Sequence, residues 1–263
     1  MKRLAIGLGL ALGLQTLAGA PGAWAATQQS PLATVLAEDG RLAAKHQHPI
    51  VVFDLDDTLF ATADRNLAII KEWAATPDGA PYRQKLDALT RDQIPYDIDG
   101  VLEANGVPAK DMPAITTFWA KRFFTSDYVK YDRPEPGAVD YVRAVLKSGA
   151  QVVYLTGRPS SMEPGTRAAL IKAGFPWDSK GKTVRLLLKS QSHQKDAAFK
   201  YQAALELAKT GTIVAGFDNE PANVNAIHKA APKALVVYLK TVHSANPPAV
   251  DPGIVQLANY DWK

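Results

Sequence analysis

The feature that most constrains this chain is an apolar run that leads directly into clustered carboxylates. Residues 50–53 are mainly β-branched or aromatic, which is typical of a buried strand. Asp54, Asp56 and Asp57 follow at once, at the carboxyl end of that strand. A buried charge costs several kcal/mol unless something pairs it. We therefore expect a metal ion, a cationic side chain or backbone donors to face these carboxylates.

A helix cap is the alternative interpretation of this stretch. Asp56, Asp57 or Thr58 could each cap a helix that begins near Leu59. Capping accounts for one polar residue or two, and Asp57 is the best candidate for such a structural role. It does not account for Asp54, which directly follows the apolar run. The segment is therefore interpreted as part of a functional site.

The first 25 residues have the three-part layout of a secretory signal peptide. Lys2 and Arg3 precede an apolar stretch over residues 4–18, and small residues follow up to Ala25. Cleavage after Ala25 would leave a periplasmic or secreted protein with no membrane attachment. A retained anchor is the alternative, but the apolar stretch is short and interrupted by Gln15.

Composition excludes several kinds of site. The chain has no Cys, which excludes disulfides, Cys-ligated zinc and thiolate catalysis. Removing the two positive charges of Lys2 and Arg3 lowers the formal charge from +4 to +2. Lys and Arg are not clustered with aromatic residues, so no nucleic-acid partner is expected. A length of 263 residues allows one large domain with a smaller insertion.

Strands and helices alternate along the second half of the chain, which predicts an α/β fold with a doubly wound parallel sheet. Strands are expected at residues 151–155, 184–188, 213–217 and 234–239, with helices at 137–147, 162–173, 196–207 and 222–229. The stretch after the first strand is mostly helical and ends in a Pro-rich boundary loop at 127–137. These patterns divide the chain into a signal peptide (1–25), an α/β core (26–59 and 133–263) and an inserted helical cap (60–132).

Polar residues stand at the carboxyl ends of three of these strands. Asp54 and Asp56 follow the first strand, Thr156, Gly157 and Arg158 end another, and a third ends at residues 218–220. Ligands of parallel sheets bind at the carboxyl ends of the strands. We therefore expect the three strand ends to meet in one crevice.

These motifs resemble those of the haloacid dehalogenase-like superfamily. Residues 53–59 look like its first motif, and Thr156 after an apolar strand looks like the second. A Lys near a helix start, followed by Asp218, is similar to the third and fourth. The four motifs occur in the expected order over roughly residues 48–240. Segments 154–158 and 186–189 are similar to the secreted acid phosphatase branch of that superfamily.

The resemblance implies a phosphomonoester hydrolase that acts through an aspartyl phosphate. Asp54 would be the nucleophile, and Asp56 the general acid and base. The second Asp favours phosphate transfer over dehalogenation. Mg²⁺ would be bound by the carboxylates of Asp54 and Asp218 and by the backbone carbonyl of Asp56. The middling length of the cap favours small organic phosphates as substrates.

The second motif leaves two choices open. Thr156, helped by the Gly157 amide, would donate a hydrogen bond to a phosphate oxygen, although a Thr at a strand end can also serve as a helix cap. Arg158 either contacts the phosphate or substrate, or forms an ion pair on the surface.

The later motifs leave further choices. The candidates for the cationic residue are Lys189, Lys195 and Lys200, and Lys195 is preferred because it lies at a predicted helix start. The fourth motif departs from the common pattern, so metal-bound waters or the Lys could be held by Asn219, Glu220 or Asn223. The cap also carries aromatic residues that either line a pocket or, as their spacing favours, form a helix core: Trp73, Trp119, Phe123 and Phe124.

Two other functions fit the same motifs. One is a phosphomutase or phosphonate hydrolase of the same superfamily, although a secretory signal disfavours an intracellular mutase. The other is a non-catalytic binding or storage protein, which the intact Asp54 and Asp56 disfavour. The sequence specifies neither the natural substrate nor the oligomeric state.

Overall fold

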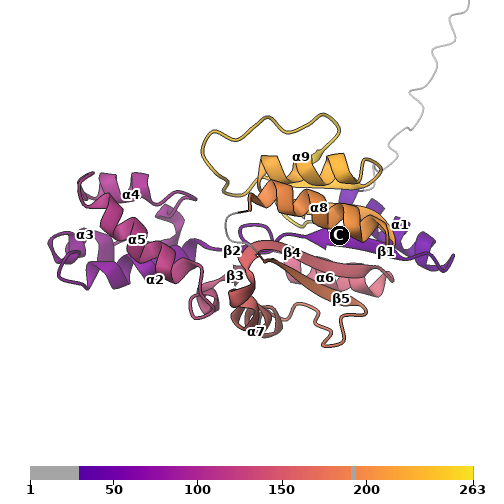
Figure 1. Ribbon diagram of the computed structural model, residues 1–263, viewed down its shortest axis with the longest axis horizontal. Coiled ribbons are helices and arrows are strands. Elements are labelled where there is room, and N and C mark those ends of the chain that lie inside the picture. Colours follow the sequence, from indigo (N-terminus) through magenta and orange to yellow (C-terminus); the bar gives the residue numbers. More distant parts are fainter. Residues whose placement is uncertain (1–29, 191–193, 263) are drawn as a thin grey trace, which may run out of the picture.

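The computed structural model describes residues 30–190 and 194–262 of the chain (Figure 1). The signal peptide expected at residues 1–25 lies outside the described residues. Within the described ranges, no helix has the length and apolar character needed to cross a membrane.

A six-stranded sheet forms the centre of the core (Figure 1). Every neighbouring pair of its strands is parallel. The strand order is β5-β4-β1-β6-β7-β8, and the strands are β1 (Pro49–Phe53), β4 (Gln151–Pro159), β5 (Val184–Lys189), β6 (Thr212–Asp218), β7 (Leu235–Leu239) and β8 (Val255–Leu257). The predicted α/β class is confirmed. The edge strand β8 was missed because it is only three residues long.

Helices cover both faces of this sheet. One face carries α1 (Pro31–Ala43), α6 (Ala138–Lys147) and α7 (Glu163–Ala173), and the other carries α8 (Asp196–Ala208) and α9 (Pro221–Ala230). Val51 and Phe53 of β1 pack into the apolar cluster of the first face, while Ile50 and Val52 pack towards α8. Because both faces are covered, the strand is apolar throughout instead of alternating.

A separate group of helices stands to one side of the core, at the left of Figure 1. It comprises α2 (Ala63–Ala74), α3 (Arg83–Asp87), α4 (Asp99–Ala104) and α5 (Met112–Phe123), with short 3-10 turns η1 (Ala80–Tyr82), η2 (Arg91–Gln93) and η3 (Val129–Tyr131). These helices enclose an apolar cluster of their own, which includes Trp73, Leu86 and Ile115. We call this group the cap.

A two-stranded antiparallel ribbon marks the root of the cap. The ribbon pairs β2 (Phe60–Ala61), where the chain leaves the core, with β3 (Arg133–Pro134), where it returns. The domain boundaries at residues 60 and 132 remain a prediction, and the ribbon lies at those positions. After β3 the chain continues into α6, and the 3-10 turn η4 (Ser160–Met162) joins β4 to α7.

A tight loop between β1 and β2 directs the clustered carboxylates. Asp57 has a backbone φ of 55°, a left-handed conformation that Asp tolerates better than most residues. Its carboxylate accepts hydrogen bonds from the backbone N (2.9 Å) and Oγ1 (2.8 Å) of Thr62, just before α2. Asp57 therefore stabilises the loop that leads from the core into the cap.

Candidate active site

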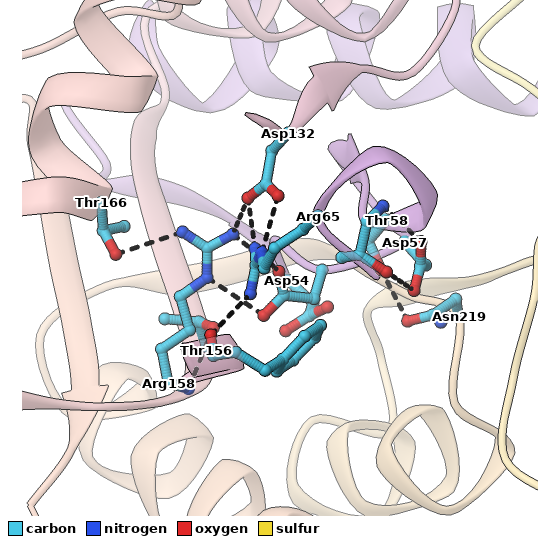
Figure 2. Close-up of polar contacts among 12 residues, drawn as sticks. Asp54, Asp57, Thr58, Arg65, Asp132, Thr156, Arg158, Thr166 and Asn219 are labelled. Atoms are coloured by element: carbon cyan, nitrogen blue, oxygen red, sulfur yellow. Dashed lines mark hydrogen bonds and ion pairs between the residues drawn. The ribbon is translucent and has the colours of Figure 1, made fainter. Parts of the chain in front are cut away.

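The carboxyl ends of the three central strands meet at one edge of the sheet, as Figure 2 shows for Asp54, Thr156 and Arg158. β1 lies between β4 and β6, so residues that end these strands become neighbours. Asp54 directly follows β1, Thr156 lies in the last part of β4, and Asp218 ends β6. The structure therefore brings together the three strand ends singled out in the sequence.

Asp54 and Asp218 share one buried cation, the ammonium group of Lys200. Lys200 Nζ lies 2.6 Å from Asp54 Oδ1 and also contacts Asp218 Oδ2. All three side chains are buried. Burial raises the pKa of Asp54, and the Lys200 charge opposes that shift. The pKa of Lys200 is raised because the attraction of Asp218 and Asp54 outweighs the cost of its burial.

The preference for Lys195 is corrected by this arrangement. Lys195 is exposed at the residue that precedes α8, whereas Lys200 lies in the helix and faces the sheet. Lys200 shares its helix face with Ala204 and Leu207, which are four and seven residues further on. That apolar spacing is the sequence signal that identifies Lys200 as the buried member. The third candidate, Lys189, pairs with Asp196 at 2.6 Å.

Asp56 faces two guanidinium groups. Arg158 donates to it from Nε (3.0 Å to Oδ2) and from Nη2 (2.6 Å to Oδ1), and Arg65 donates from Nη2 to Oδ1 at 2.7 Å. Burial acts to raise the pKa of Asp56, but Arg158 and Arg65 outweigh it and hold that pKa below its ordinary value. The arrangement stabilises the ionised carboxylate, the form that accepts a proton.

Arg158 does not pair on the surface, which was one alternative for it; it is among the residues that line the pocket, and its contact with phosphate or substrate stays a prediction. It is 1% exposed, and besides Asp56 it contacts Asp132 and Thr166. Thr156 is also buried, and its Oγ1 accepts a hydrogen bond from the Arg158 backbone N at 3.2 Å. The Thr156 hydroxyl hydrogen therefore stays available to a ligand oxygen.

Arg65 and Asp132 were not singled out in the sequence. Arg65 could have been found, because it shares a face of α2 with Ile69 and Trp73, so a charge lies in an apolar stripe. Asp132 follows η3 in an irregular stretch and carries no periodic signal. Burial raises the pKa of Asp132, against the opposing charges of Arg65 and Arg158.

Residues around Asp218 have structural partners. Asn223 Nδ2 donates to Asp218 Oδ1 at 3.1 Å, and so does the backbone N of Glu220 at 2.9 Å. The Glu220 carboxylate accepts hydrogen bonds from the backbone N and Oγ of Ser244. Asn219 accepts from Thr58 Oγ1 at 3.0 Å and donates to a carbonyl of the following loop. Asn223 thus orients Asp218, while Asn219 and Glu220 hold neighbouring loops.

These groups line a pocket of about 220 Å³ between core and cap. Its core side carries the charged and hydroxyl groups, and its cap side carries Tyr96, Trp119, Phe123 and Phe124. We call the last three of these the aromatic wall. The expectation of a helix core is thus wrong for the wall but right for Trp73, which is buried inside the cap.

The donor atoms at this edge suit a hard divalent cation. Asp54 and Asp218 supply carboxylate oxygens, and with one Lys between them they leave an excess negative charge. Mg²⁺ is commonly bound by one or two protein carboxylates together with substrate phosphate oxygens. Among the described residues, no group of three or more His, Cys, Asp or Glu side chains is placed to hold a metal ion. The residues therefore fit Mg²⁺ that is held jointly with a phosphate.

Comparison with known proteins points to the same superfamily. The family model of haloacid dehalogenase-like hydrolases matches residues 51–176, which include β1, the cap and β4. The match ends before Lys200 and Asp218. Together with the parallel α/β fold, it supports the haloacid dehalogenase-like hydrolase superfamily. No match is found among curated proteins.

Solved structures are similar to this chain at low sequence identity. A phosphatase candidate from Clostridium difficile is 12% identical, with a TM-score of 0.50 over 80% of this chain and 94% of the other. A predicted phosphatase from Clostridium acetobutylicum is 13% identical (TM-score 0.48; 81% and 94% covered). A class C acid phosphatase from Bacillus anthracis is 14% identical (TM-score 0.39; 78% and 72% covered). These likenesses concern the fold alone, and the acid phosphatase branch remains a prediction.

Proposed function

We propose that this chain is a Mg²⁺-dependent phosphomonoester hydrolase that acts through an aspartyl phosphate. The observation that supports it most is the buried Lys200, which pairs with Asp54 and Asp218 beside the pocket that Asp56 and Thr156 also line. A nucleophilic carboxylate, a fixed cation and a second carboxylate are the groups that phosphoryl transfer requires.

Asp54 Oδ2 is the attacking atom in this proposal. Its Oδ1 is occupied by Lys200, whereas Oδ2 accepts no hydrogen bond from the part of the chain that the structure describes. Attack forms the bond from Oδ2 to phosphorus while the bond to the leaving oxygen breaks. Lys200 orients Asp54 and favours its ionised form, and the Thr156 hydroxyl and Gly157 amide donate to phosphate oxygens.

Asp56 moves the protons. Its ionised carboxylate takes the proton of the bound phosphomonoester monoanion and passes it to the leaving oxygen, and then accepts one from the water that attacks phosphorus as the bond to Asp54 breaks. Asp54 and Asp218, with the Asp56 backbone carbonyl, would hold Mg²⁺. When bound, that ion would neutralise the charge of the phosphoryl group.

The aromatic wall supports a small substrate whose leaving group has an apolar face. Trp119 and Phe123 stack with ring centroids 4.6 Å apart, and Phe124 meets both edge-on. Phe124 is 46% exposed, so part of its ring is free to contact a ligand. The described cap residues that line the pocket carry no charge, which disfavours a leaving group with a second anionic group.

The central experiment measures phosphate release from phenyl phosphate with and without Mg²⁺. The purified protein should release phosphate only with the cation, and Asp54→Asn should lose about 10³-fold or more in rate. Lys200→Met should lose about 10²-fold or more, whereas Lys195→Met should stay within about 3-fold of the wild type. Full turnover of the Asp54→Asn variant would refute the mechanism.

A second experiment tests the aromatic wall. Phe124→Ala should raise KM for phenyl phosphate by about 2- to 10-fold, the value of one aromatic contact, and leave an alkyl phosphate unaffected. Tyr131→Ala is the matched control, because this exposed cap ring is not among those that line the pocket. Equal effects on the two substrates would show that Phe124 only stabilises the cap.

Export to the periplasm or the medium, with cleavage after Ala25, is part of the proposal and rests on the sequence of the first residues. Amino-terminal sequencing of the protein from the extracytoplasmic fraction would check it. A mature chain that begins at Met1 would contradict it.

A further inference from the structure

A closed ring of four charged residues joins the root of the cap to Asp56. Figure 2 shows three of its members, Arg65, Asp132 and Arg158. Arg65 belongs to α2 of the cap, and Asp132 lies where the cap returns to the core. Arg158 and Asp56 belong to the core, at the ends of β4 and β1. We call these four residues the charge ring.

Each guanidinium of the charge ring donates to one carboxylate from both Nε and Nη2, and donates to the second carboxylate from Nη2 alone. Arg158 binds Asp56 in this way, and its Nη2 also lies 2.8 Å from Asp132 Oδ2. Arg65 donates from Nε to Asp132 Oδ1 at 2.7 Å and from Nη2 to Asp132 Oδ2, and the same Nη2 reaches Asp56. Such bidentate contacts fix the plane of a carboxylate as well as its distance.

Burial separates Asp56 from the other three members. The side chains of Arg65 and Asp132 are fully buried and that of Arg158 is 1% exposed, whereas that of Asp56 is 28% exposed. Asp56 is therefore the member of the charge ring that is accessible from the pocket. Two positive and two negative charges balance, so the buried part of the ring carries no uncompensated charge while all four are ionised.

The two oxygens of Asp56 are not equivalent. Oδ1 accepts hydrogen bonds from both Arg65 and Arg158, and Oδ2 accepts one, from Arg158 Nε. A carboxylate oxygen has two lone pairs. Oδ2 therefore retains a lone pair that can take or carry a proton, whereas Oδ1 is saturated.

We infer that Arg65 and Asp132 are positioning residues, which hold the Asp56 carboxylate so that Oδ2 faces the leaving oxygen. This inference rests on the proposed hydrolysis. In the first step Oδ2 takes the proton of the bound phosphomonoester monoanion and passes it to the leaving oxygen as the bond from that oxygen to phosphorus breaks. In the second step Oδ2 takes a proton from the attacking water as the aspartyl phosphate is cleaved.

Arg65 also connects the aromatic wall to the charge ring. Its Nη1 donates to the Phe123 carbonyl at 3.3 Å, and its guanidinium lies 4.4 Å from the centre of the Phe123 ring. The side chain that fixes the end of α5 thus also fixes Asp56. The position of the cap and the orientation of the proton-transfer group are coupled through this one residue.

The test compares two aryl phosphates whose leaving oxygens differ in how much they need a proton. Phenyl phosphate has a basic leaving group, and p-nitrophenyl phosphate has a much less basic one. Because kcat/KM reports only the steps up to formation of the aspartyl phosphate, kcat/KM of Arg65→Met for phenyl phosphate should fall about 10- to 100-fold, while kcat/KM for the nitro compound falls less than about 3-fold. Arg65→Lys should recover only part of this loss, because Lys cannot make the two-nitrogen contact.

A double variant keeps the test decisive if a single variant folds poorly. Arg65→Met with Asp132→Asn removes one charge of each sign and leaves the neutral pair of Asp56 and Arg158. It should fold. Its ratio of kcat/KM for the nitro compound to kcat/KM for phenyl phosphate should still be higher than that of the wild type. Arg122→Met is the control, because it breaks a cap ion pair with Glu72 that lies away from the ring. It should leave the ratio unchanged.

Two results would overturn the inference. Equal losses on both substrates would show that the ring only stabilises the fold. If the double variant had the same ratio of nitro-compound to phenyl phosphate kcat/KM as the wild type, Arg158 alone would orient Asp56. A wild-type protein inactive on both substrates would instead refute the proposed function, and the positioning roles with it.

Discussion

The charge ring predicts a strong coupling between Arg65 and Asp132 in the stability of the fold. Asp132→Asn would leave two guanidiniums with one carboxylate, and Arg65→Met would leave two carboxylates with one guanidinium. All these groups are buried except Asp56, which is 28% exposed. Breaking a buried pair by removing one partner costs about 3–5 kcal/mol, and we expect that cost for each single variant.

The double variant should cost much less than the sum of the two single costs, because its remaining pair is neutral. Additive costs would total about 6–10 kcal/mol, whereas the double variant leaves no uncompensated charge and should cost no more than either single variant, about 3–5 kcal/mol or less. Urea unfolding at pH 7 of the wild type and the three variants gives all four free energies. Lys209→Met is the control, since its ion pair with Glu206 is exposed and should be worth less than about 1 kcal/mol.

Two outcomes would refute this reasoning. Additivity within about 0.5 kcal/mol would show that Arg65 and Asp132 do not share a network. A cost below about 1 kcal/mol for Asp132→Asn would match an exposed pair, and would show that Asp132 carries no charge in the folded protein.

Other predictions concern the stability of the core and the cap. Burial raises the pKa of Asp39 to about 7. The Asp39 carboxylate has one described partner, Ser148 Oγ at 3.2 Å. Because the pKa of Asp39 is higher in the folded than in the unfolded protein, the free energy of unfolding should fall as pH rises from about 4 to about 7. Asp39→Asn should remove this decline and raise the free energy of unfolding at pH 8 by up to about 4 kcal/mol, as measured by thermal unfolding. Gly165→Ala would place Cβ 2.4 Å from the Ser126 carbonyl oxygen and should cost about 1–3 kcal/mol, whereas Gly100→Ala, in a helix with open space around it, should stabilise by about 0.5–1 kcal/mol. Calorimetry showing the same sign for both glycine variants would contradict this.

Parts of the site that depend on one short segment are readable from the sequence. A strand that is buried on both faces has a continuous apolar sequence, and the first charged residue marks its end. Asp54 and Asp56 could therefore be placed at a strand end without the structure. Asp218 follows from the same logic at the end of β6. Helices between such strands then predict a parallel sheet, which brings these ends together.

Proximity to a helix start was not enough to choose the Lys. Lys189, Lys195 and Lys200 all lie near the start of α8, and only the rotation of that helix against the sheet decides which one is buried. The sequence rule of a Lys near a helix start favoured Lys195. The apolar face shared with Ala204 was the better guide, because burial follows the helix face and not the distance from its first residue.

The amino-acid sequence by itself thus determined the sheet, the position of Asp54 at a strand end and the order of the motifs, because each depends on residues adjacent in the chain. The tertiary structure alone decided the charge ring, whose members Arg65 and Asp132 are 67 residues apart and whose Arg158 lies 102 residues from Asp56. No periodicity relates residues at such separations. They are brought together by the return of the cap to the core, and the cost of burying an unpaired charge is the reason that they pair there.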